Sequence, residues 1–325
     1  MNPPETNSNE KPRQQTRVAP VGSATVRAPG VCGELVQGIR DDVYFLVTCP
    51  VDFFSQVQVE LFRDGSGVEA PADCPKAAAA LRATMKYLGR EQLAAKLTVR
   101  NPIPRSKGMG SSSADVAATI AATGLALEVE LSPAVVAEIA LAVEPTDGVM
   151  FPGVALFDHR EGRIVEMLGQ PPPIEIVALD FGGTVDTVEF NRVDRRSLWQ
   201  SIEAETSEAL ELVRSGVQQG DAGLVGRGSS ISALASQKVL PKPKLPAVAE
   251  FARDVGAVGV NVGHSGTVIG ILLDARQRRG KSTFLQARRA FPEAETVHHF
   301  RLLGGGLKPV AGEGDSSIER TTERK

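Results

Sequence analysis

The sequence predicts an α+β fold, because strand and helix patterns intermix along the chain instead of alternating in regular βαβ units. Its 325 residues suit two domains of ordinary size, and 42% hydrophobic with 23% charged residues is typical of a globular protein. The chain contains no internal repeat and no sustained heptads, which excludes solenoids and coiled coils. A proline run at 171–173 marks the expected boundary, which gives domains at 21–170 and 171–308.

The first half opens with strand patterns and continues with helices. Alternating or β-branched apolar residues predict strands at 24–28, 44–49, 56–62, 96–100, 154–157 and 163–167. Helical composition predicts helices at 76–88, 114–122 and 133–143. Pro75 and Gly89 suit the two ends of the first helix, and Ser132 with Pro133 suits the start of the third.

The second half shows a similar mixture. Strands are expected at 174–179, 257–262, 267–273 and 296–302. Helices are expected at 197–219, 221–237, 247–255 and 282–290, with a break at the prolines of 241–246. Residues 1–20 and 309–325 are polar, and we expect both to be disordered tails.

Charge and cysteine content narrow the class of protein. A net charge of −3 argues against a nucleic-acid groove or a polybasic membrane anchor, so the expected partner is a small-molecule substrate. The chain has no apolar leader and no long apolar stretch, which disfavours secretion and membrane spanning. Three cysteines without a CxxC pair do not suit a disulfide framework or a zinc site, so we expect a cytoplasmic protein. The oligomeric state stays open.

A glycine- and serine-rich segment, Pro104–Ala114 (PRSKGMGSSSA), carries the strongest chemical signal. Glycines at the mouth of a helix allow backbone N–H groups to approach an anion closely, and the helix dipole adds positive charge there. Three serine hydroxyls could also contact a phosphate or a metal. Alone, the segment fits a flexible turn with a good N-cap equally well.

Two further segments accompany this loop, Ala28–Glu34 (APGVCGE) near the start and Gly259–Gly270 (GVNVGHSGTVIG) near the end. Together, in this order, the three resemble the motifs of the GHMP kinase superfamily. The resemblance is closer to its L-threonine kinase branch, which serves cobalamin synthesis. It is carried by Ala28–Gly38, Phe45–Val51, Lys107–Ser113, Glu144–Arg160 and His264–Gly270.

The superfamily resemblance implies a fold and a set of cofactors. The fold is an N-terminal domain like ribosomal protein S5 domain 2 and a ferredoxin-like C-terminal domain, with the nucleotide and substrate in the cleft between them. The cofactors are ATP and Mg²⁺. The ATP-binding residues that it implies are Pro104, Lys107, Gly108, Met109, Gly110, Ser111, Ser112 and Ser113. The third motif implies cleft residues at His264, Ser265 and Gly266, although a lone histidine such as His264 is more often a hydrogen-bonded structural residue.

The carboxylates of Glu144 and Asp147 are the candidate catalytic pair. In isolation their segment, Glu-Pro-Thr-Asp-Gly, fits a surface turn. The resemblance implies instead that Glu144 holds magnesium, together with a serine of which Ser112 is the candidate, and that Asp147 faces the acceptor hydroxyl. Magnesium prefers hard oxygen ligands beside phosphates, and a second carboxylate can accept or orient a hydroxyl proton. Whether Asp147 acts as a base or an orienting group is left open, as is the choice of serine.

The implied activity is phosphorylation of the hydroxyl of free L-threonine by ATP, which gives O-phospho-L-threonine. Two alternatives remain: a kinase of the same family that acts on another small hydroxy acid or amino alcohol, and a non-catalytic ATP-binding sensor on the same fold. A separate triplet, Asp180-Phe181-Gly182, is similar to a protein-kinase motif, but no HRD-type loop precedes it. It predicts only the end of a strand and a Gly–Gly turn.

Overall fold

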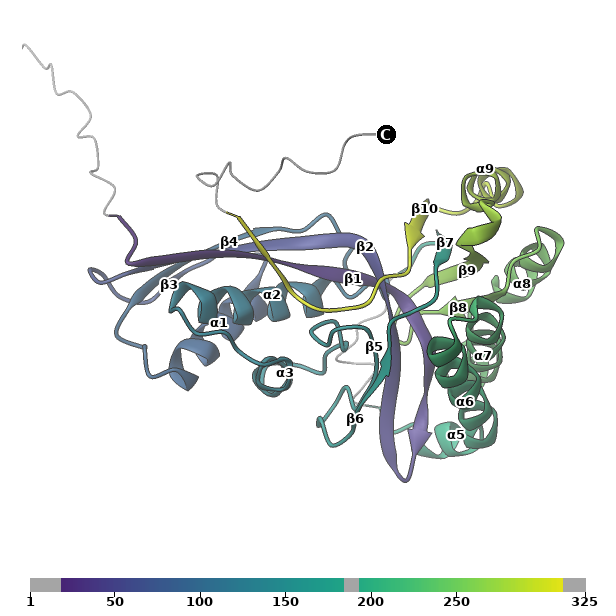
Figure 1. Ribbon diagram of the computed structural model, residues 1–325, viewed down its shortest axis with the longest axis horizontal. Helices are drawn as coiled ribbons and strands as arrows, with labels where there is room; N and C mark the ends of the chain where they lie inside the picture. Colours follow the sequence, from purple (N-terminus) through teal and green to yellow (C-terminus); the bar gives the residue numbers. More distant parts are fainter. Residues whose placement is uncertain (1–18, 184–192, 312–325) are drawn as a thin grey trace, which may run out of the picture.

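The computed structural model describes residues 19–183 and 193–311 (Figure 1). Its strands are β1 (Gly22–Arg40), β2 (Val43–Phe62), β3 (Val68–Glu69), β4 (Ala94–Arg100), β5 (Val154–Phe157), β6 (Val165–Gly169), β7 (Ile174–Asp180), β8 (Gly259–Val262), β9 (Val268–Asp274), β10 (Thr296–Arg301) and β11 (Lys308–Val310). Its α-helices are α1 (Pro75–Tyr87), α2 (Ser111–Ala126), α3 (Pro133–Leu141), α5 (Arg196–Gln200), α6 (Glu203–Gln219), α7 (Ala222–Ala235), α8 (Leu245–Asp254) and α9 (Gly280–Ala290). The mixed α and β content is the predicted one.

All described strands belong to one sheet. Its main path runs β10-β7-β9-β8-β1-β2-β4-β3, while β11 pairs with β1 and β5 joins β2 to β6. Every pair in it is antiparallel except β3 with β4. The sheet therefore crosses the expected boundary at 171–173, and the division into domains at 21–170 and 171–308 stays a prediction.

The β1–β2 hairpin joins the two halves of the molecule. Asp41 and Asp42 form its turn with φ of 50° and 61°, as a tight two-residue hairpin turn requires. Pairing shifts register at three places between Pro29 and Val36, and Figure 1 shows both strands bending on their way between the halves. Bulges of this kind let a strand continue past a proline and several glycines while it changes direction. The first motif, predicted only as a segment between short strands, thus lies within a long strand at the bend.

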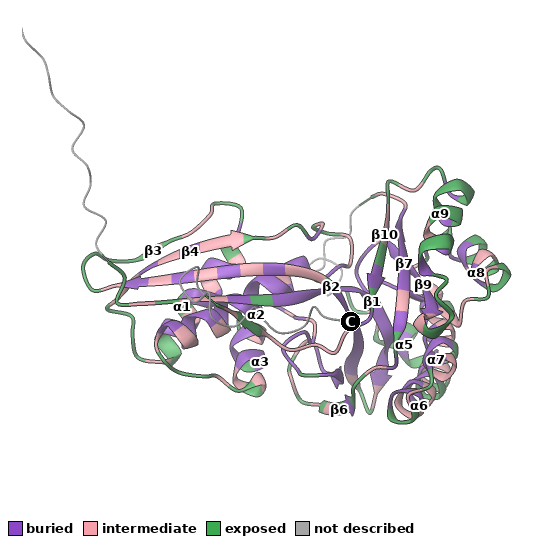
Figure 2. Cartoon of the chain, turned by 45° about the horizontal axis from the view of Figure 1, so that its top comes forward, coloured by how far each residue is buried: buried purple, intermediate pink, exposed green. Residues whose placement is uncertain are grey.

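Helices cover one face of the sheet in each half. In the first half α2 packs on β1 and β2 with α1 and α3 beside it; in the second, α6 and α7 pack together, α8 lies on β8 and β9, and α9 lies on β7 and β10 (Figure 1). Figure 2 shows burial concentrated on α2 and on the strands where the halves meet. The predicted cap at Ser132 is confirmed, because its hydroxyl accepts a hydrogen bond from Val135 N. At the start of α7 the Asp221 carboxylate accepts from Gly223 N and Leu224 N.

Three expectations need correction. The helix predicted at 114–122 begins at Ser111, so the serines form its first turn. The single helix predicted at 197–219 is divided into α5 and α6, at the point where Trp199 and Ile202 turn into a small apolar cluster with Ile39 and Tyr44. The C-terminal tail predicted from 309 starts too early, because β11 pairs with β1 through Val310.

The predicted disorder of the remaining tail residues lies largely outside the described part of the chain, at 1–18 and 312–325. Within the described ranges, no helix is both long and apolar enough to cross a membrane.

Candidate active site

The N-terminus of α2 lies at the centre of the site. Gly110 caps the helix with φ of 65°, and Gly108 has φ of 78°. Side chains at these positions would be strained, and a Cβ on Gly110 would lie 3.0 Å from Asp147 Oδ2. The two glycines therefore keep the backbone of this turn open to a neighbouring group, as an anion-binding turn requires.

The three motifs meet at this turn. In the first, Val31 N donates to Met109 O at 3.0 Å and Gly33 N donates to Gly108 O at 3.2 Å. From the third, Thr267 N donates to Lys107 O at 3.0 Å. The loop is thus hydrogen-bonded through its backbone to β1 on one side and to the β8–β9 connection on the other.

Beside the helix N-terminus is a cleft of about 380 Å³. Most residues predicted for the site line it: Pro104, Gly108, Met109, Gly110, Ser111, Ser112, Ser113, Glu144, Asp147, His264 and Ser265. Lys107 and Gly266 do not. Gly266 packs instead beneath Gly108, where a Cβ would come within 2.2 Å of the Gly108 Cα.

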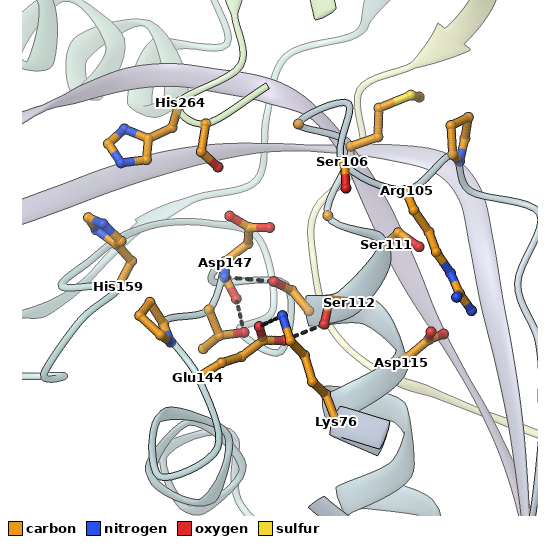
Figure 3. Close-up of a pocket in the computed structure, with 18 of the residues that line it drawn as sticks. Lys76, Arg105, Ser106, Ser111, Ser112, Asp115, Glu144, Asp147, His159 and His264 are labelled. Atoms are coloured by element: carbon orange, nitrogen blue, oxygen red, sulfur yellow. Dashed lines mark hydrogen bonds and ion pairs between the residues drawn. The ribbon is translucent and has the colours of Figure 1, made fainter. Parts of the chain in front are cut away.

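Glu144 joins two elements inside the cleft. Its Oε1 accepts a hydrogen bond from the Ser112 hydroxyl, and its Oε2 pairs with the Lys76 ammonium of α1 (Figure 3). The Glu144 side chain is only 7% exposed, whereas that of Lys76 is 43% exposed. A hydroxyl and a carboxylate side by side are the hard oxygen donors that Mg²⁺ prefers.

The Asp147 backbone lies against the same helical turn, where its N–H donates to the Ser113 hydroxyl at 3.1 Å. The carboxylate opens on to the cleft but is surrounded by protein atoms, and this burial raises its pKa from 3.8 to about 6. The Glu144 charge adds to the rise in pKa, while hydrogen bonding by Ser113 opposes it. A carboxylate with a pKa near 6 is ionised at neutral pH and is a better proton acceptor than an ordinary aspartate.

Comparison with known proteins agrees with this geometry. A model of the GHMP kinases N terminal domain matches residues 75–152. An L-threonine kinase from Salmonella typhimurium is 31% identical over 296 residues, which cover 88% of this chain and 95% of that protein. The L-threonine kinase of Citrobacter freundii is 32% identical over 254 residues, 77% of this chain and 86% of that protein. The chain belongs to the GHMP kinase family.

Solved structures show the same fold. A homoserine kinase from Cytophaga hutchinsonii superposes with a TM-score of 0.69 at 18% identity, covering 89% of this chain and 98% of the other. The structure of MDDEF in complex with MVAPP, AMPPCP and magnesium gives a TM-score of 0.64 at 15% identity, covering 90% and 99%. The predicted GHMP kinase fold is confirmed, and the protein is a phosphotransferase with an alcohol acceptor.

GHMP kinases use ATP with Mg²⁺. Within the described residues no group of three or more His, Cys, Asp or Glu side chains could hold a metal ion. One carboxylate and one hydroxyl beside a phosphate-binding turn are nevertheless sufficient for Mg²⁺, because its remaining ligands are usually water and substrate phosphates.

At the far end of this kinase's cleft lie Glu34, His159 and His264. Glu34 is 4% exposed, and its Oε2 has no hydrogen-bond partner among the described residues. Burial, and then the Asp147 charge, raise the pKa of Glu34 well above its usual value. Burial lowers the pKa of His159 to about 3, with help from Arg160, so the ring is neutral.

His264 is held by contacts with several side chains. Its Nδ1 lies 2.8 Å from Gln37 Oε1, and its ring stacks on Trp199 with centroids 5.7 Å apart. The same ring lies edge to face with His159 at 5.0 Å and borders the cleft. His264 therefore combines fixed packing with a place in the cleft wall.

Sequence reasoning missed Lys76, Glu34 and His159 as site residues. One signal was available for Lys76: it stands in the first turn of a helix, where the dipole disfavours a positive charge, so an unusual partner is expected there. Glu34 and His159 lie within segments that carry the family resemblance, but only their burial in the folded chain distinguishes them from their neighbours.

Proposed function

We propose that this GHMP kinase transfers the γ-phosphoryl group of ATP to the hydroxyl of L-threonine, giving O-phospho-L-threonine and ADP. The observation that carries the proposal is the 31% identity to an L-threonine kinase across 88% of this chain and 95% of that protein. Homoserine and mevalonate kinases share the fold, so the fold alone does not choose the acceptor.

The turn at Gly108–Ser113 would receive the ATP phosphates. Its backbone N–H groups and the dipole of α2 favour negative charge at that point. Ser112 and Glu144 would hold Mg²⁺, which when bound neutralises charge on the transferring phosphoryl group. Lys76, which pairs with Glu144 at the cleft surface and is 43% exposed, would release this carboxylate to the metal ion.

Asp147 would face the acceptor hydroxyl. Phosphoryl transfer depends mainly on positioning and electrostatics, and the acceptor oxygen must lose its proton as the new P–O bond forms. With a pKa of about 6, the carboxylate is ionised at neutral pH and can take that proton. The Ser113 hydroxyl, which accepts from Asp147 N, holds this residue against the first turn of α2.

Glu34 supports an amino acid as the acceptor. Its carboxylate is buried in the cleft, and the described residues give Oε2 no hydrogen-bond donor. Leaving such an oxygen unsatisfied is costly, and an α-ammonium group would supply both the donor and the opposite charge. A hydroxy acid without an amine would leave the cost in place, which favours threonine over that alternative.

The decisive experiment incubates purified protein with ATP, Mg²⁺ and equal concentrations of L-threonine, L-serine, L-homoserine or 3-hydroxybutyrate. ADP release gives the rate and mass spectrometry identifies the product. We expect phosphothreonine as the preferred product and almost no reaction with 3-hydroxybutyrate, which lacks the amine. Preference for another alcohol would overturn the substrate, and ATP binding without turnover of any acceptor would favour the sensor alternative.

A pair of variants tests the role given to Glu34. Glu34→Gln should raise KM for L-threonine at least tenfold while ATP affinity changes little, because about 1.4 kcal/mol corresponds to that factor. Glu69→Gln, at an exposed carboxylate on the edge strand β3, is the matched control and should leave both constants unchanged. An unchanged KM in Glu34→Gln would remove the ammonium contact from the proposal.

A further inference from the structure

Lys107, predicted to bind ATP, points away from the cleft. Its ammonium lies 2.7 Å from Asp180 Oδ2 at the end of β7 and 3.0 Å from both Glu295 Oε2 and Gly183 O. The Lys107 side chain is 15% exposed and that of Asp180 is 5% exposed. A residue of the phosphate-binding loop is therefore tied through its side chain to the second half of the molecule.

Asp180 also contacts the connection between β8 and β9. Its Oδ1 accepts a hydrogen bond of 2.6 Å from the Thr267 hydroxyl. Thr267 N and Val268 N in turn donate to Lys107 O, at 3.0 and 3.1 Å. Lys107 is thus fixed at both its ammonium and its carbonyl, by groups that the same aspartate brings together.

The backbone beside these bonds has little freedom to shift. Gly108 and Gly266 face each other so closely that a Cβ on Gly266 would lie 2.2 Å from the Gly108 Cα and N. Glycines make the isolated loop flexible, so its conformation must be imposed by contacts outside it. Such a restraint matters because an error of about 1 Å in the placement of reacting groups can cost about 10²-fold in rate.

We propose that Lys107, Asp180 and Thr267 form a latch that holds the phosphate-binding loop in its nucleotide-binding conformation, with Lys107 as a positioning residue and not an ATP ligand. Asp180 and Glu295 already neutralise the Lys107 charge, so it adds little attraction for phosphates. Its contribution is to dock the loop on the second half. The latch goes beyond the proposed function and does not depend on which alcohol is the acceptor.

The test compares Lys107→Met, Asp180→Asn and the double variant, with calorimetry for Mg-ATP and steady-state kinetics. A latch predicts that each single change weakens ATP binding by about tenfold, and that the double variant is no weaker than the worse single variant, because both break the same contact. KM for L-threonine should stay within about twofold. Lys107→Arg, which keeps the charge and the reach, should restore most of the affinity.

A direct ATP contact by Lys107 predicts a different pattern. Lys107→Met would then weaken ATP binding, while Asp180→Asn would leave it unchanged or tighten it by releasing the lysine. That result would overturn the latch. The matched control is an exposed ion pair in the second half of the molecule, in which Lys244 Nζ lies 2.6 Å from Glu293 Oε1. Its removal should change neither the affinity for Mg-ATP nor KM for L-threonine.

A milder variant and a second measurement keep the test valid if the variants above lose stability. Thr267→Val removes one hydroxyl with little change in shape and should weaken ATP binding in the same direction by a smaller factor. Hydrogen exchange should accelerate at the Thr267 and Val268 amides, which donate to Lys107 O, in each latch variant, while the amides of the β10–β7 pairing keep their protection. Unchanged exchange at these two amides together with unchanged ATP affinity would refute the proposal.

Discussion

Two clusters, each with one carboxylate, one hydroxyl and one lysine ammonium, lie on opposite sides of the loop that precedes α2. In the cleft, Glu144 lies between the Ser112 hydroxyl and the Lys76 ammonium. Behind the loop, Asp180 lies between the Thr267 hydroxyl and the Lys107 ammonium. Both carboxylates are buried, at 7% and 5% exposed, but Lys76 is 43% exposed whereas Lys107 is 15% exposed.

That difference indicates what each cluster can do. A solvated lysine can move away, which leaves a carboxylate and a hydroxyl at the cleft wall for a metal ion. Lys107 has three acceptors around its ammonium, and moving it away would leave the buried carboxylate of Asp180 without its partner, which is costly in free energy. The same three functional groups therefore suit metal binding on one side of the loop and rigid attachment on the other.

The largest expected effect is on kcat, and it should distinguish a group that takes part in the reaction from one that positions the loop. Asp147→Asn keeps the shape of the cleft but removes the proton acceptor, so kcat should fall by about 10²- to 10⁴-fold with ATP affinity nearly unchanged. Asp180→Asn should show the reverse, with weakened ATP binding and a smaller loss of kcat at saturating ATP. Turnover with saturating substrates and calorimetry for Mg-ATP measure both. A loss below about tenfold in Asp147→Asn would favour an orienting role for Asp147.

Metal dependence should distinguish the two clusters next. Glu144→Gln removes an anionic oxygen from the cleft, so we expect a rate loss on the order of 10²-fold that added Mg²⁺ partly reverses. The latch variant Asp180→Asn should show no such rescue. A magnesium titration of kcat at saturating ATP and L-threonine measures the difference. Equal rescue in both variants would contradict the separate roles. Wild-type turnover in Glu144→Gln would show that the segment at 144–148 is a structural turn without a role in the reaction.

The pH dependence offers a further distinction. Because burial raises the pKa of Asp147 to about 6, the fraction of ionised carboxylate grows with pH up to that point. The kcat/KM for L-threonine should rise about tenfold per pH unit below 6 and level off above it. Asp180→Asn should keep this limb, and Asp147→Asn should lose it. A limb near pH 4 in the wild-type enzyme would show that an ordinary carboxylate controls the reaction.

The sequence indicated most of the residues that line the cleft, but not the contacts of Lys107 behind the loop. Glycine spacing indicated the loop, and the family resemblance indicated Glu144 and Asp147. Short apolar runs placed β7 and β9 within a residue of their ends. Lys107 was assigned to ATP because the family resemblance includes it in the loop at 107–113. Its actual partners Asp180 and Glu295 are 73 and 188 residues away in the chain, and an ion pair over such a separation leaves no local pattern.

Lys76 and the long hairpin escaped prediction for related reasons. The Lys76–Glu144 contact spans 68 residues, so the position of Lys76 in the first turn of a helix indicates an unusual partner without identifying it. Strand β1 was predicted as a short piece because proline and glycines at the first motif resemble a loop, and β2 was predicted as two pieces separated by a segment that begins at Pro50. Bulges allow the pairing to continue there, and only the tertiary context decides that it does.

The smallest expected effect concerns stability, and it again contrasts the two sides of the loop. The pKa of Asp147 is about 6 in the folded protein and near 3.8 in an unfolded chain, so the folded state binds its proton more tightly. The stabilisation from that proton is complete below pH 3.8 and is lost as pH rises through about 6. At pH 7 the ionised carboxylate therefore lowers the free energy of unfolding.

Asp147→Asn should therefore raise the free energy of unfolding at pH 7 by about 1 kcal/mol, allowing for the partial access of this carboxylate to the cleft. The gain should shrink as pH falls from 7 to 4. Asp180→Asn should do the opposite and destabilise at pH 7, because its carboxylate is paired with Lys107 and Thr267. Urea unfolding at several pH values measures both variants. Destabilisation by Asp147→Asn that does not change with pH would show that this carboxylate, like Asp180, supports the fold.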